Sequence, residues 1–91
     1  MYRKKFSEGA ILGEVLKEGV YWAFMGRPFE VMPFLRGKLL KEANGRQKDI
    51  EKLLKELEKL YKEISMSSRI SEEQMKLVMS YREKILKCLK S

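Results

Sequence analysis

The stretch that decides the fold is Arg46-Gln47-Lys48-Asp49-Ile50-Glu51-Lys52-Leu53-Leu54-Lys55-Glu56-Leu57-Glu58-Lys59-Leu60-Tyr61-Lys62-Glu63-Ile64. Its apolar residues recur at intervals of four and three, which keeps them on one face of an α-helix. They are Ile50, Leu54, Leu57, Tyr61 and Ile64, with Leu53 and Leu60 widening the face. A face this wide is typical of a helix inside a bundle.

The same spacing continues backwards through Gln47, Ala43 and Leu40, so it predicts a long helix over about 38–64. Asn44-Gly45 is also a normal helix stop. However, a glycine inside a helix costs only about 1 kcal/mol relative to alanine. We therefore expect one continuous helix that can bend at Gly45.

A second helix is predicted over about 71–90. Ser71 stands three residues before Gln74, which is the spacing of a capping box at a helix start. Two helices joined by the short turn at 65–69 should run antiparallel. Residues 38–91 are therefore predicted to form an amphipathic helical hairpin, and this hairpin cannot bury its apolar stripes alone.

The first 37 residues permit two interpretations. Leu12, Val15 and Leu16 share one face of a helix. Alternatively, two segments rich in strand-favouring residues flank Gly26 and predict a β-hairpin over about 20–32. We expect an all-α domain over 1–91, in which an aromatic-rich helical segment (1–37) packs on the hairpin (38–91). The α+β fold with the β-hairpin is the alternative.

Aromatic and methionine residues are dense in one short segment. Within fourteen residues lie Tyr21, Trp22, Phe24, Met25, Phe29, Met32 and Phe34. The favoured interpretation is that they form the core of the single chain, and the alternative is a binding surface. A thin core often completes itself by oligomerising, so we expect a homo-oligomer, most simply a dimer, or a complex with another helical protein. The predicted interface residues are Trp22, Phe24, Phe29, Phe34, Leu54, Leu57 and Tyr61.

The formal net charge is +7, and a basic surface could contact nucleic-acid phosphates. Between Arg36 and Lys48, only Glu42 opposes five positive charges, whereas residues 49–91 are nearly balanced with ten basic and eight acidic side chains. The predicted nucleic-acid contacts are Arg3, Lys4, Lys5, Arg36, Lys38, Lys41, Arg46 and Lys48. The simpler interpretation is a solvated surface that keeps the protein soluble.

The sequence contains few of the residue types that usually act in catalysis or bind metals. The chain has no histidine and one cysteine, Cys88, which disfavours a zinc site and excludes an internal disulfide. We predict no catalytic residues, no metal and no cofactor, and hence no enzyme. The longest uncharged stretch is 19–26, far short of the roughly twenty residues that span a membrane. We expect a cytoplasmic protein, and its Lys and Glu enrichment is a tendency of hyperthermophiles.

These patterns predict a non-enzymatic helical module for protein–protein interaction or assembly, which associates with itself. The alternative is a small, basic, nucleic-acid-binding regulator that uses the 36–48 stretch.

Overall fold

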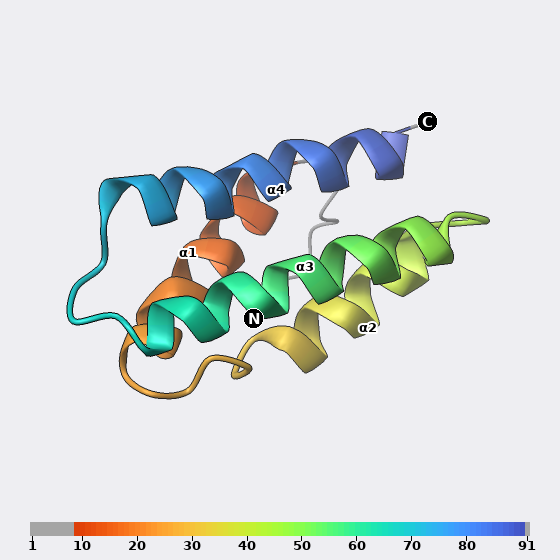
Figure 1. The fold of residues 1–91 in the computed structure, drawn as a ribbon. Coiled ribbons are helices and arrows are strands. Elements are labelled where there is room, and N and C mark those ends of the chain that lie inside the picture. The colour runs from red at the N-terminus through yellow and green to blue at the C-terminus, as the bar shows by residue number, and fades with distance from the viewer. Residues whose placement is uncertain (1–8, 91) are drawn as a thin grey trace.

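Four α-helices and the turns between them make up residues 9–90, the part of the chain that the computed structural model describes (Figure 1). They are α1 (Ala10–Phe24), α2 (Met32–Glu42), α3 (Gln47–Ser65) and α4 (Glu72–Lys90). No strand occurs among these residues, so the all-α prediction is confirmed and the β-hairpin over about 20–32 is wrong. Val20 and Ala23 continue the buried face of α1, and this packing overrides the strand preference of the segment.

The predicted continuous helix over 38–64 is also wrong, because α2 ends at Glu42 and α3 begins at Gln47. Gly45 between them has a φ of +76°, a left-handed conformation that glycine adopts without a steric penalty. The Ala43 N–H still donates to the Leu39 carbonyl at 2.9 Å, and the chain then reverses. As a result α2 lies beside α3 and runs in the opposite direction (Figure 1).

The core is built on the predicted apolar stripe of α3. Ile50, Leu54, Leu57, Tyr61 and Ile64 are all fully buried. The other three helices contribute Leu12, Val15, Leu16, Val20, Ala23, Leu35, Leu39, Val78, Ile85 and further side chains to the same cluster. The single chain therefore covers the stripe that a hairpin by itself could not.

A buried hydroxyl links α3 to α1. Oη of Tyr61 donates a hydrogen bond to the Leu16 carbonyl at 2.9 Å, and burial raises the pKa of Tyr61 well above its ordinary value. Gly19 makes this approach possible, since a Cβ there would lie 2.5 Å from Cζ of Tyr61 and 2.9 Å from Cγ2 of Val31. Glycine at this position thus sets the distance between α1 and α3.

α4 begins with the predicted capping box. The Gln74 N–H donates to Oγ of Ser71 at 3.0 Å, and the Ser71 N–H donates to Oε1 of Gln74 at 3.1 Å. Each side chain satisfies a backbone donor at the helix start, so this prediction is confirmed. α4 then runs beside α3 in the opposite direction (Figure 1), and Oη of Tyr81 donates to Oε1 of Glu56 across the pair at 3.0 Å.

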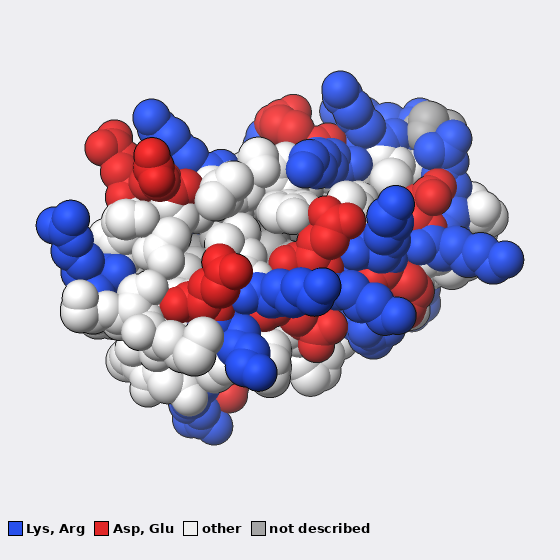
Figure 2. All heavy atoms as spheres, viewed as in Figure 1, with Lys and Arg blue, Asp and Glu red and all other residues white. Residues whose placement is uncertain are grey.

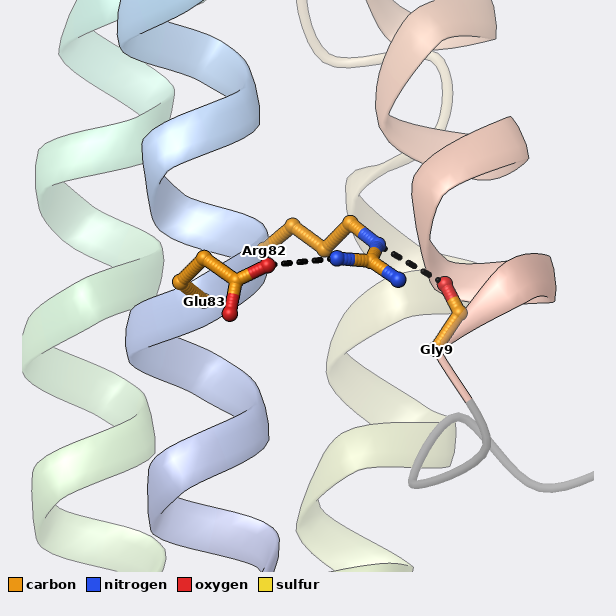
Figure 3. Close-up of polar contacts among 3 residues, drawn as sticks. All are labelled: Gly9, Arg82 and Glu83. Atoms are coloured by element: carbon orange, nitrogen blue, oxygen red, sulfur yellow. Dashed lines mark hydrogen bonds and ion pairs between the residues drawn. The ribbon is translucent and has the colours of Figure 1, made fainter.

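Arg82 joins α4 to the start of α1 (Figure 3). Its Nε donates to the Gly9 carbonyl at 3.0 Å, and its Nη1 donates to Oε1 of Glu83 at 2.5 Å. A Cβ on Gly9 would lie 2.8 Å from Nη2 of Arg82, and one on Gly13 would lie 3.3 Å from Cδ. Two glycines one helical turn apart therefore leave room for the arginine between the helices.

Candidate interaction surfaces

One surface is formed by large apolar side chains that the core does not bury. It contains Tyr21, Phe24, Met25, Phe29 and Phe34, whose exposed fractions are between 41% and 65%. We call these five residues the aromatic surface. All five come from one segment of fourteen residues, which contains the end of α1, the connection to α2 and the start of α2. The segment thus directs these side chains toward solvent, and the favoured prediction that they fill the core is wrong for these five.

The helical period of α1 explains how the surface arises. The outward face carries Glu14, Lys17 and Glu18 in its first turns, all of them exposed. Tyr21, Phe24 and Met25 continue the same face at spacings of three and four. The outward face of α1 therefore changes from charged to apolar over its last turn and a half.

The connection between α1 and α2 has a defined conformation. The Arg27 N–H donates to the Trp22 carbonyl at 2.8 Å and the Gly26 N–H donates to the Ala23 carbonyl at 3.0 Å, which is the Schellman pattern of a helix end. The Arg27 guanidinium lies 5.3 Å from the centre of the half-buried Trp22 ring, and its Nε is 3.1 Å from Oε1 of Glu30. These contacts stabilise the backbone that carries Phe29.

Figure 2 shows how charge is distributed on the face in view. Lys and Arg side chains crowd the right end, where α2 connects to α3 and α4 finishes (compare Figure 1). A broad uncharged area covers the lower left, where α1 ends and leads into α2. On this face, the uncharged area at the lower left therefore lies apart from the cationic right end.

The predicted interface residues fall into two groups. Phe24, Phe29 and Phe34 are exposed and Trp22 is half-buried beside them. Leu54, Leu57 and Tyr61 are instead fully buried in the core, because α1, α2 and α4 cover that face of α3. The prediction that these last three residues form an interface between chains is therefore corrected: they form part of the core of one chain.

The predicted basic stretch over 36–48 is not a continuous cationic stripe. Arg36 is paired with Glu51 of α3, and Nζ of Lys38 is 4.0 Å from Oε2 of Glu42. Lys41 and Lys48 are exposed and Arg46 is half-exposed, but the chain reversal between α2 and α3 separates them from a single helix face. Arg3, Lys4 and Lys5 lie outside the described residues.

A second basic feature, which the sequence interpretation missed, runs along the outward face of α3. It consists of Lys48, Lys52, Lys55, Lys59 and Lys62, all exposed. We call these residues the lysine ridge. The signal was present in their spacing of four, three, four and three, which places them opposite the apolar stripe. The net charge of residues 49–91 does not reveal the ridge, because acidic side chains on the flanks of the helix offset the charge of its lysines.

A shallow groove lies between α3 and α4. It has a volume of about 420 Å³ and is lined by Asp49, Lys52, Leu53, Glu56, Lys84, Lys87 and Cys88. Burial, the hydrogen bond to Glu56 and the charge of Glu56 together raise the pKa of Tyr81, whose hydroxyl donates to Glu56 of this lining. Among residues 9–90, no three side chains of the metal-ligating types come together, and no helix has the length and apolar character needed to cross a membrane.

Comparison of this chain with protein-family models, with curated proteins and with solved structures finds no match.

Proposed function

We propose that this protein is a non-enzymatic helical interaction module that associates with a second copy of itself through the aromatic surface. The observation that supports the proposal is the exposure of Tyr21, Phe24, Met25, Phe29 and Phe34 beside a core that is already complete. Large apolar side chains exposed to water are unfavourable, and burying them against a partner would lower the free energy. We propose the cytoplasm as its compartment, where the lone Cys88 stays reduced.

The size of the aromatic surface supports a specific interface. Large aromatic side chains bury about 150–250 Å² each. Four aromatic side chains and Met25, taken as similar in size and on average half-exposed, present roughly 500 Å² of apolar area. That value lies near the upper end for the largest patch on a typical monomer, roughly 300–600 Å². A stable interface buries about 800 Å² on each partner. The aromatic surface supplies more than half of this, and a polar rim supplies the rest.

The composition of the surface also fits association. Phenylalanine, tyrosine and methionine are enriched in the buried centres of protein interfaces, and charged residues are depleted there. Arg27 and Glu30 stand beside Phe29 and neutralise one another at 3.1 Å, so two copies can approach without unbalanced charge there. In a dimer with twofold symmetry the same patch faces itself, and a self-complementary apolar surface needs no opposite charge on the partner.

Sedimentation equilibrium between about 5 and 500 μM tests the proposal. We expect the wild-type mass to rise from monomer to dimer with concentration. The double variant Phe24→Ser/Phe29→Ser should stay monomeric throughout, because it removes two rings from the centre of the surface. Leu77→Ser is the matched control, since Leu77 is 53% exposed but belongs to α4, and it should dimerise as the wild type does.

A wild type that remains monomeric at 500 μM contradicts self-association. Dimerisation that the Phe24→Ser/Phe29→Ser variant retains, or that Leu77→Ser abolishes equally, places the interface elsewhere. Circular dichroism of the wild type and both variants establishes that each is helical.

A further inference from the structure

The lysine ridge has a regular geometry. Its five residues are spaced so that all lie within about 40° of one line along α3, given 100° per residue. From Lys48 to Lys62 the line is about 21 Å long, at 1.5 Å per residue. All five side chains are exposed, and within residues 9–90 none of them forms an ion pair. Among the described residues, the ridge is thus a straight row of exposed ammonium groups without an ion pair.

Two of the five carboxylates on the flanks of α3 are engaged by neighbouring helices and not by the ridge lysines. Glu51, on one flank, pairs with Arg36 of α2. Glu56, on the other, accepts the hydroxyl of Tyr81 in α4. Packing against the neighbouring helices therefore draws these acids away from the ridge. Asp49, Glu58 and Glu63 also lie on the flanks and confine the positive potential to a narrow line.

Further cations extend the ridge at one end. Lys52 lines the groove between α3 and α4 together with Lys84 and Lys87. Lys41 stands in the last turn of α2, and Arg46 stands directly before α3, which Lys48 helps to begin. Figure 2 shows Lys and Arg side chains along the line of α3 and concentrated at this end of the molecule. Cationic side chains therefore gather beyond the Lys48 end of the ridge, away from the aromatic surface.

We propose that the lysine ridge binds the phosphate backbone of a nucleic acid without reading its sequence. A duplex carries one negative charge per about 1.7 Å of its axis, so a 21 Å row of cations faces roughly a dozen phosphates. Lysine acts as a point charge that contacts phosphate and carries no base information. This surface is separate from the aromatic surface, and its use does not depend on self-association.

A nucleic acid suits this surface better than a lipid bilayer does. The ridge contains no apolar side chain, whereas stable attachment of a helix to a membrane surface requires buried apolar area in addition to charge. The segment that carries the aromatic surface, from the end of α1 to the start of α2, lies away from the connection between α2 and α3 where the extra cations gather (Figure 1). A linear polyanion needs only the row of ammonium groups that the ridge provides.

Fluorescence anisotropy with labelled 20-nucleotide probes, single-stranded and duplex, tests the proposal at 25–200 mM salt. With five phosphate contacts, affinity for a duplex should fall about 500-fold between 50 and 200 mM salt. The variant Lys52→Gln/Lys55→Gln/Lys59→Gln should bind about tenfold more weakly or worse at 50 mM. It should also reduce the slope of log K against log salt by about 2–3. Comparison of the two probes shows which form of the backbone is preferred.

The matched control Lys17→Gln/Arg69→Gln/Lys76→Gln removes three exposed cations outside the ridge. It should change the affinity less than twofold. Equal losses in both triple variants would show that net charge alone attracts the probe and would overturn the proposal. Absence of wild-type binding at 25 mM salt, or binding to phosphatidylserine vesicles without binding to either probe, overturns it as well. Because all six residues are exposed, both variants keep their fold, which circular dichroism verifies.

Discussion

At Gly19, a hydrogen atom occupies the space that a methyl group would need. A Cβ there would meet the Tyr61 ring at 2.5 Å and Val31 at 2.9 Å, and both neighbours lie in the core. We expect Gly19→Ala to lower the free energy of unfolding by about 1–3 kcal/mol or more, because overpacking forces the backbones of α1 and α3 apart. Urea denaturation of the variant and the wild type measures the difference.

Gly37 is the control for this substitution. It lies within α2, and no atom is within 4 Å of the position that its Cβ would take. Gly37→Ala should therefore raise the free energy of unfolding by about 0.5–1 kcal/mol, since alanine loses less conformational entropy in a helix. A Gly19→Ala variant as stable as Gly37→Ala would contradict the close packing of Tyr61 against α1.

At the scale of elements, Gly45 separates α2 from α3 with a φ of +76°. We expect Gly45→Ala to lower the free energy of unfolding by about 1–2 kcal/mol, which is the cost of a left-handed conformation for a residue with a Cβ. In a continuous helix over 38–64, the same substitution would instead stabilise the protein by about 1 kcal/mol. The sign of the change in urea denaturation therefore decides between the two arrangements, with Gly37→Ala as the control for a helical glycine.

The break between α2 and α3 shows which features a local sequence pattern cannot predict. The apolar period of α3 and the Ser71–Gln74 capping box are set by residues close in sequence, and both could be predicted. Whether Gly45 continues a helix or ends it depends on about 1 kcal/mol of local preference. The packing of Leu35 and Leu39 in the core outweighs that preference, and no local pattern contains this information.

The candidate surfaces were predictable to a similar extent. The density of aromatic residues around 21–34 was visible in the sequence, but their exposure was not, because periodicity shows that a face is apolar without showing what covers it. For the same reason the apolar period predicts an interface between chains at Leu54, Leu57 and Tyr61, where the structure has the core of one chain. The spacing of the lysine ridge can be seen in the sequence alone, whereas the partners of the flanking acids Glu51 and Glu56 depend on contacts with α2 and α4.

At the scale of the whole molecule, the core and the aromatic surface should contribute separately to stability and to assembly. Because Leu57 is fully buried among helices of one chain, Leu57→Ala should lower the free energy of unfolding by about 2–5 kcal/mol. The monomeric Phe24→Ser/Phe29→Ser background isolates this effect from dimerisation. In that background, thermal unfolding should have the same midpoint at 5 and 500 μM, with or without Leu57→Ala, since no association is linked to folding.

Two other results would each indicate a different environment for the apolar stripe of α3. If two chains shared the α3 stripe, dilution of the Phe24→Ser/Phe29→Ser variant would lower its midpoint, because dissociation would expose Leu54 and Leu57. If the stripe faced water, Leu57→Ala would change stability by less than about 0.5 kcal/mol, as surface substitutions do. A large and concentration-independent loss is expected only when one chain completes its own core, and a complete core leaves the aromatic surface outside it, where we propose that a second copy binds.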